Sequence, residues 1–233
     1  LAISGGFGKI VLGQDDDAAD SYNIDEMDLP TEEPGTTLAS ATIGSSSSIS
    51  STDAMKVAYH LPAMGGFSAG VSFADSGTNT GTDKTSMGAK YSMEAGGAAI
   101  TLGYATQTTE ATTKDTDQSN MGLKVVTGDL SLIVSQGTTE AVDEDIDNQG
   151  ASISYKMPNG MTIAAYTFKS EDALDAGEEY SRSGAEVAYS IASGLTAVVN
   201  VEDYDYKVGT DQDGAGTVSD NGTVTALTLK ASF

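Results

Sequence analysis

The feature that most constrains this chain is a repeat of segments, roughly ten residues each, in which apolar and polar residues alternate. A period of two places the two kinds of side chain on opposite faces of a β-strand. In segment 85–93, Met87 and Tyr91 share one face, and Ser86 and Lys90 share the other. The alternation predicts twelve strands, at 4–13, 54–61, 67–73, 85–93, 98–106, 119–127, 130–137, 149–157, 161–169, 181–191, 195–203 and 223–233.

The connections between these segments alternate between short and long. Five are short and carry glycine, proline or asparagine suited to tight turns, at 62–66, 94–97, 128–129, 158–160 and 192–194. Six are long, at 14–53, 74–84, 107–118, 138–148, 170–180 and 204–222. One end of the sheet therefore has tight turns and the other has loops, which is typical of transmembrane β-barrels of outer membranes.

The charge of the chain excludes some classes of function. The formal net charge is −23, and 29 of the 34 carboxylates fall in the six long connections. This charge argues against nucleic acid as a partner, because phosphate backbones are bound by lysine and arginine. It is compatible with disorder, with an acidic calcium-binding cell-surface or adhesin-like β-protein, or with a surface that meets divalent cations.

Catalysis finds no support in the sequence. The chain has one histidine (His60), no cysteine, and no nucleophile-elbow or Walker-type motif, so we expect no enzymatic activity. No run of about 18 apolar residues is present, so the sequence predicts no transmembrane helix.

The repeat predicts an all-β fold, a transmembrane antiparallel up-and-down barrel formed by residues 1–233 as one domain. In lipid, every backbone polar group needs an internal partner, which a closed barrel provides. The face opposite the apolar one carries serine, threonine, glycine and lysine, and therefore cannot form a dry core. Twelve or more strands leave a lumen too wide for side chains to fill. The sequence thus predicts a water-filled channel in the bacterial outer membrane, passing ions and small hydrophilic solutes by passive diffusion, with the long loops outside the cell.

The candidate pore residues are an acidic loop and a basic wall. The loop 14–53 contains nine carboxylates that we expect at the constriction: Asp15, Asp16, Asp17, Asp20, Asp25, Glu26, Asp28, Glu32 and Glu33. Parity places six basic or titratable groups on the inward face of the strands: Lys56, His60, Lys90, Lys124, Lys156 and Lys230. Acid facing base would set a transverse field across the channel, and the acidic mouth predicts weak cation selectivity.

Two further groups of residues carry expectations. Tyr59, Tyr91, Tyr155 and Tyr189 each lie three residues before a short turn on the apolar face, which predicts an aromatic girdle that Phe233 joins. The cluster Asp15, Asp16, Asp17 and Asp20 could hold Ca²⁺, although its spacing does not match an EF-hand. No cofactor is required.

Two motifs give the chain a resemblance to a known family. Gly6-Phe7-Gly8-Lys9-Ile10-Val11-Leu12-Gly13-Gln14 resembles the strand before the constriction loop in general porins, especially those of α-proteobacteria. Leu229-Lys230-Ala231-Ser232-Phe233 resembles the C-terminal signal that the barrel assembly machinery reads. The family's loop often carries a Pro-Glu-Phe-Gly-Gly-like element, whereas Glu33-Pro34-Gly35 here lacks the aromatic.

The resemblance implies several properties of the assembled protein. It implies a homotrimer embedded among outer-membrane lipid and lipopolysaccharide, with 14–53 as a constriction loop folded into the pore. The family usually has sixteen strands with this loop after the fifth, so the first predicted strand here corresponds to the fifth and four N-terminal strands are missing. From the residues alone, an even number such as twelve could also close by itself.

Overall fold

The computed structural model describes residues 1–25, 49, 54–75, 83–174, 178–207 and 219–231. They form one antiparallel sheet of thirteen strands in which every strand pairs with its neighbours in sequence. Their bounds are β1 Ala2–Gly5, β2 Gly8–Asp15, β3 Ala54–His60, β4 Phe67–Ala74, β5 Lys84–Ala95, β6 Ala98–Thr109, β7 Thr116–Thr127, β8 Leu130–Glu140, β9 Asp145–Lys156, β10 Met161–Asp172, β11 Glu179–Ala192, β12 Leu195–Lys207 and β13 Ser219–Ala231.

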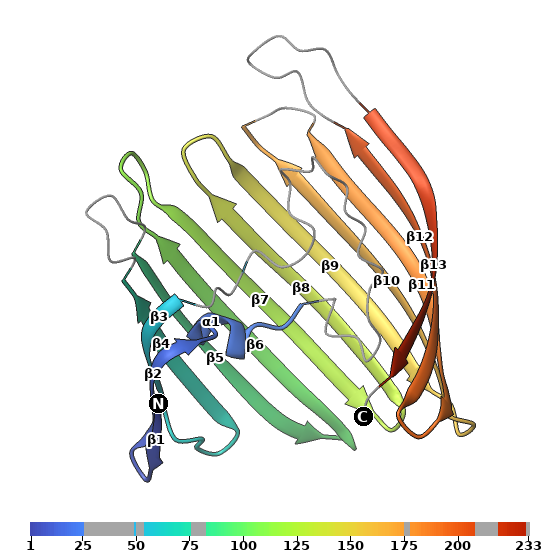
Figure 1. The fold of residues 1–233 in the computed structure, drawn as a ribbon, viewed down its shortest axis with the longest axis horizontal. Helices are drawn as coiled ribbons and strands as arrows, with labels where there is room; N and C mark the ends of the chain where they lie inside the picture. Colours follow the sequence, from blue (N-terminus) through green and yellow to red (C-terminus); the bar gives the residue numbers. More distant parts are fainter. Residues whose placement is uncertain (26–48, 50–53, 76–82, 175–177, 208–218, 232–233) are drawn as a thin grey trace.

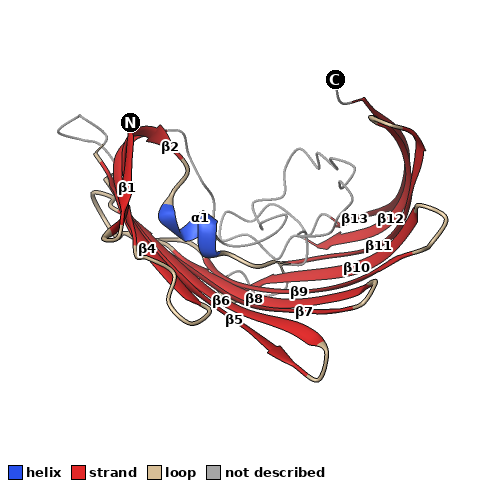
Figure 2. Ribbon diagram, turned by 90° about the horizontal axis from the view of Figure 1, so that it is seen from below, coloured by secondary structure: helices blue, strands red, loops and turns tan. Residues whose placement is uncertain are grey.

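The sheet curls into an open trough, and the short helix α1 (Ala18–Tyr22) lies on its concave side (Figures 1 and 2). We call the concave side the inner face. The edge strands β1 and β13 do not pair with each other among the described residues. No helix in the described part of the chain is long and apolar enough to cross a membrane.

The expected up-and-down β architecture is confirmed, with one correction at its start. The segment 4–13 was predicted as one strand, but it is the end of β1, a turn and most of β2, so thirteen strands replace twelve. Gly5 pairs directly with Gly8 across this turn. Gly8 has a φ of 108°, a conformation that side chains with a Cβ rarely adopt, which explains why glycine closes the hairpin.

The short turns are tight because glycine occupies their left-handed positions. Gly96 and Gly97, with φ of 61° and 82°, join β5 to β6, and Gly128, Gly160 and Gly194 serve three further short turns with φ of 57°, 82° and 75°. Two consecutive positive φ values match the right-handed twist of the strands that such a hairpin connects.

The strands extend further toward the long connections than the alternation of apolar residues predicted. β10 runs to Asp172 and β12 to Lys207, whereas the predicted strands ended at 169 and 203. Several acidic residues that were assigned to loops therefore pair within strands. In these strand ends both faces carry polar side chains, so the sequence shows no alternation of apolar with polar residues there.

The two faces of the sheet have inverted polarity compared with a soluble protein. Met87 and Tyr91 on the outer face are 50% and 44% exposed, whereas Ser86 on the inner face is 1% exposed. The outer face continues this way to β13, where Leu227 and Leu229 are among the most exposed apolar residues. Because exposed apolar side chains cost free energy in water but not in lipid, the outer face fits a bilayer.

Candidate functional site

The inner face carries a segment of the chain folded back onto it. We call residues 16–25, which include α1, the inserted segment. It follows β2 and lies across the inner face of β3 to β6 in the trough (Figure 2). Ala18, Ala19, Tyr22 and Ile24 of this segment are buried against the wall. A constriction loop folded inward was expected here, and residues 16–25, together with Ile49, which packs with Ala19 and Ala105, are the described parts of 14–53 that lie against the wall.

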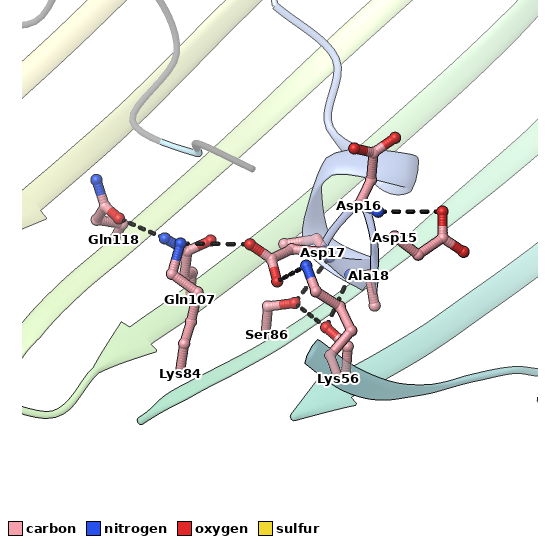
Figure 3. A network of polar contacts seen from close by, with 11 residues as sticks. Asp15, Asp16, Asp17, Ala18, Lys56, Lys84, Ser86, Gln107 and Gln118 are labelled. Atoms are coloured by element: carbon pink, nitrogen blue, oxygen red, sulfur yellow. Dashed lines mark hydrogen bonds and ion pairs between the residues drawn. The ribbon is translucent and has the colours of Figure 1, made fainter. Parts of the chain in front are cut away.

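A buried ion cluster fixes the start of the inserted segment. Asp17 Oδ1 accepts a hydrogen bond from Lys56 Nζ at 2.7 Å, and Asp17 Oδ2 is 3.3 Å from Lys84 Nζ (Figure 3). The side chains of Asp17 and Lys56 are 1% and 0% exposed, and that of Lys84 is 11% exposed. Because the Asp17 and Lys56 side chains are both buried, removal of one would leave the other as an unpaired buried charge, which is strongly destabilising.

The first turn of α1 is bound to the wall through its backbone. Ala18 N donates to Ser72 Oγ at 2.9 Å, and Ala19 N donates to Ser86 Oγ at 3.2 Å. The two serine hydroxyls share a further hydrogen bond of 2.7 Å. These N–H groups have no partner within a helix, so side chains of β4 and β5 satisfy them instead.

The end of the inserted segment is held by polar side chains of two strands. Tyr22 Oη and His60 Nδ1 share a hydrogen bond of 2.9 Å, and burial raises the pKa of the Tyr22 phenol above its ordinary value. Asn120 Nδ2 donates to Ile24 O at 2.8 Å and to Asn23 Oδ1 at 2.5 Å. β3 to β5 and β7 therefore all contribute to anchoring the segment.

The inner face of β10 to β12 carries a second polar cluster made of side chains alone. Tyr166 Oη donates to Glu202 Oε2 at 2.6 Å, and Asn200 Nδ2 donates to Tyr166 Oη at 3.3 Å. Asn200 Nδ2 is also 3.4 Å from Glu186 Oε2. Arg182 Nη1 lies 3.9 Å from Glu202 Oε2, with its guanidinium 5.9 Å from the centre of the Tyr166 ring. All five side chains are buried.

An aromatic cluster on the inner face joins this polar cluster toward the long connections. Phe168 and Tyr180 have ring centres 6.2 Å apart, and Tyr180 meets Tyr206 edge-on at 6.5 Å. Arg182 stacks over the Phe168 ring at 5.3 Å, and Ile146 completes the cluster. The sequence analysis singled out aromatic residues of the outer face alone, and these inner-face rings of β10 to β12 were not among them.

The nine acidic residues of the expected constriction divide into four groups. Asp17 is buried in the ion cluster, Asp16 and Asp20 are exposed, and Asp15 and Asp25 are half-buried. Asp15 ends β2, with its Oδ1 accepting the backbone N–H of Asp16. Glu26, Asp28, Glu32 and Glu33 lie outside the described residues.

The six basic or titratable wall residues all have inner-face parity. Lys56 and His60 contact the inserted segment directly. Lys90 pairs across the ladder with Gly103, and Lys124 lies two residues after Gly122, and both glycines lie under the segment. Lys156 and Lys230 follow inner-face residues of β9 and β13 near the short turns. Lys56 differs from the other lysines among these six because its side chain is an anchor closed to solvent.

The four tyrosines of the expected girdle lie on the outer face near the short turns. Tyr91, Tyr155 and Tyr189 are 44%, 44% and 46% exposed, and Tyr59 Oη donates to Phe7 O at 2.6 Å. Cross-strand partners of these rings include Phe67 for Tyr91 and Leu130 for Tyr155. Phe233 lies outside the described residues.

Sequence reasoning missed several residues of the two clusters. Lys84 was assigned to a long connection. It lies two residues before Ser86 in β5 and therefore on the same inner face as Ser86 and Lys90. Arg182, Glu186 and Glu202 were not singled out. Their signal is a charged residue at the same parity as polar neighbours within a strand whose other face is apolar.

The four aspartates considered for Ca²⁺ do not share one environment. Of the four aspartates considered for Ca²⁺, Asp17 is already bound by two lysines. Within the described ranges, no group of three or more histidine, aspartate or glutamate side chains could hold a metal ion.

Comparison with known proteins agrees with the geometry. No curated protein matches the sequence. Among solved structures, the chain resembles an anion-selective porin from Comamonas acidovorans with 15% identity and a TM-score of 0.64, over 98% of this chain and 74% of that one. It also resembles the outer-membrane protein OmpT of Vibrio cholerae with 18% identity and a TM-score of 0.62, over 98% of this chain and 79% of that one. The family profile described as Gram-negative porin matches residues 1–213. The match agrees with a sheet that is apolar outside and polar inside and with a segment folded onto its inner face. The chain therefore belongs to the Gram-negative porin family and is an outer-membrane porin channel.

Proposed function

We propose that the channel passes ions and small hydrophilic solutes by passive diffusion and is weakly cation-selective. The observation that carries this proposal is the inner face, where polar side chains and an acidic inserted segment line the trough while the outer face is apolar. Buried oxygens such as Glu202 Oε1 and Asn200 Oδ1 have no hydrogen-bond partner within the described part of the protein. Water in the lumen would satisfy such atoms, since buried polar groups require partners.

The exposed acids of the inserted segment favour cations. Asp16 and Asp20 are the exposed acids of the inserted segment, while Lys56 and Lys84 are paired with Asp17. The charged side chains of β10 to β12, Arg182, Glu186 and Glu202, are buried and therefore add little to the charge that a solute meets. The exposed acids of the inserted segment support the cation preference, and the inner-face lysines support a field of acid against base beside it: Lys90, Lys124, Lys156 and Lys230. The family membership also favours a channel over an adhesin-like protein.

Reversal potentials in a salt gradient across a planar bilayer test the selectivity. We expect a preference for K⁺ over Cl⁻ that falls roughly twofold in an Asp16→Asn, Asp20→Asn double variant, because exposed charges act through water and are partly screened. Asp129→Asn, at the short turn between β7 and β8, is the matched control and should leave the preference unchanged. Clear anion preference in the unaltered protein would reject the proposal.

We propose a homotrimer with the long connections outside the cell. One solved structure of similar fold is titled as a trimer form of OmpT, with 17% identity and a TM-score of 0.61, over 98% of this chain and 79% of that one. Recognition by the barrel assembly machinery through Phe233 belongs to the same proposal. Conductance steps that occur in threes, together with the mass of the detergent-solubilised assembly, test the trimer. Single independent steps and a monomeric mass would reject it.

We also propose that lipopolysaccharide contacts the outer face above the apolar band. There, carboxylates oppose one another across strands, as Asp117 opposes Glu140, whereas Glu171 and Glu179 share Lys169 between them. Like charges in such pairs are destabilising unless cations screen them. Divalent cations that bridge anionic headgroups would supply this screening. The proposal predicts that Mg²⁺ raises the unfolding temperature more in lipopolysaccharide-containing vesicles than in phosphatidylcholine vesicles, and equal effects would reject it.

A further inference from the structure

Four glycines of the inner face lie directly beneath the inserted segment. Gly70 pairs with Gly88 across β4 and β5, and Gly103 pairs with Gly122 across β6 and β7. We call these two cross-strand pairs the glycine seat. None of the four has a left-handed backbone, so their conformation alone does not require glycine. The reason for glycine must therefore lie in what each position contacts.

Three of the four glycines would meet the main chain or the first side-chain atoms of the segment. The exception is Gly70, where a Cβ would lie 2.7 Å from His60 Nδ1 and 2.9 Å from the Tyr22 ring. A Cβ at Gly88 would lie 2.7 Å from Tyr22 Cβ, and a Cβ at Gly103 would lie 2.7 Å from Tyr22 O. A Cβ at Gly122 would overlap Ile24 O and lie 2.6 Å from Ile24 Cβ. The partners of Gly88, Gly103 and Gly122 are backbone or backbone-proximal atoms, so no rotamer change can relieve these three overlaps.

The seat is occupied by a segment that is pinned on both sides of it. Asp17 is held in the buried ion cluster before the seat, and at the far end of the seat Ile24 O accepts a hydrogen bond from Asn120 Nδ2. Carbon atoms pack at about 3.5–4.0 Å, so one added methyl would have to lift the pinned segment by roughly 1 Å. The only open direction is away from the wall, toward the middle of the trough.

We propose that the glycine seat sets the bore of the channel, because it lets the inserted segment lie in backbone contact with the wall. The four glycines are positioning residues for the solute path. The proposal rests on the channel function proposed above. On this side of the lumen, the largest solute that can pass is therefore limited by the wall beneath the segment as well as by the side chains of the segment.

Single-channel conductance and exclusion of polyethylene glycols of increasing size test the proposal. Gly103→Ala should lower the conductance step and the largest polymer that enters, and Gly103→Val should lower both further. Gly6→Ala is the matched control, because a Cβ there meets no atom within 4 Å. Heat-modifiable gel mobility selects folded protein for every variant, so that conductance is recorded only from assembled channels.

A second variant pair separates the contact from a general loss of packing. The atom nearest to a Cβ at Gly88 is Tyr22 Cβ, so Gly88→Ala should lower the conductance in the unaltered background but not in a Tyr22→Gly background. An equal loss in both backgrounds would overturn the assigned contact.

The outcomes distinguish this inference from the channel function itself. Absence of any conductance from the unaltered protein would reject the proposed function. A conducting unaltered protein whose folded Gly103 and Gly88 variants have the same or a larger conductance and polymer cutoff would overturn the glycine seat alone.

Discussion

The two halves of the inner face are built in different ways. On β3 to β7, glycine and serine leave room for the chain itself, and the inserted segment lies on the wall through backbone contacts and one buried ion cluster. On β10 to β12, large side chains cover the inner face themselves, and the Arg182 guanidinium lies over the rings of Tyr166 and Phe168. Small residues thus make a place for a folded segment, whereas large ones form the wall by themselves. The first half should control the bore, and the second should mainly control stability.

Tyrosine lies over glycine in both halves. Tyr166 opposes Gly184 directly across β10 and β11, and a Cβ at Gly184 would overlap the Tyr166 ring. Tyr22 covers Gly70 and Gly88 in the other half, but it comes from the inserted segment. An aromatic ring packed on a cross-strand glycine covers exposed backbone in both cases.

The largest effect is expected from Asp17→Ala, which removes the carboxylate shared by two lysines. Lys56 would be left buried without its partner, which costs about 3–5 kcal/mol when a buried pair is broken. We expect the inserted segment to leave the wall, with a lower unfolding temperature and a noisy, altered conductance step. Asp16→Ala, an exposed neighbour, is the control. Equal behaviour of the two variants would show that the ion cluster does not hold the segment.

A smaller effect is expected from Tyr166→Phe in the other half. The change removes the hydroxyl that donates to Glu202, and an unsatisfied buried acceptor costs about 1–3 kcal/mol. The midpoint of urea unfolding should fall, while the conductance step stays unchanged because the inserted segment is not touched. The contrast between the halves would fail if Tyr166→Phe altered the conductance as Asp17→Ala does.

The sequence predicted the sheet better than the site. Alternation identified both faces correctly, because burial on one face and lipid on the other apply at every second residue, as Met87 and Ser86 show. The hairpin at Gly5 to Gly8 was missed, although Gly5, Gly6 and Gly8 lie within four residues and glycine is typical of tight turns.

The contacts of the site depended on register and could not be obtained from parity. Asp17 was one of nine similar carboxylates, and nothing local marks it as the buried one. Its role follows from the position of α1 over β3 to β5, which brings Lys56 and Lys84 to the same carboxylate. Likewise, Tyr166 and Glu202 are 36 positions apart and meet only through the pairing of β10, β11 and β12.

The smallest effect is expected from a pH-dependent group in a long connection. The pKa of Glu144, between β8 and β9, is raised by burial and by the nearby charges of Asp172 and Asp143. A raised pKa means that the folded state binds the proton more tightly than the unfolded state. Stability should therefore rise slightly as the pH falls from above the folded pKa toward the ordinary glutamate value.

The pH dependence can be isolated by substitution. Glu144→Gln should remove this part of the slope of unfolding temperature against pH, whereas Glu110→Gln, in the connection between β6 and β7, should leave it in place. If both variants keep the slope of the unaltered protein, Glu144 does not contribute to it.

The central claim is that neighbouring residues of one strand face lipid and water in turn. The chain has no native cysteine, so single cysteines can be placed at the outer-face Tyr155 and the exposed inner-face Lys156 of β9 and compared in liposomes. We predict that a charged, water-soluble methanethiosulfonate labels Lys156→Cys and not Tyr155→Cys, and that a lipid-soluble maleimide shows the opposite preference. Equal labelling of both positions, or the reverse pattern, would contradict the account.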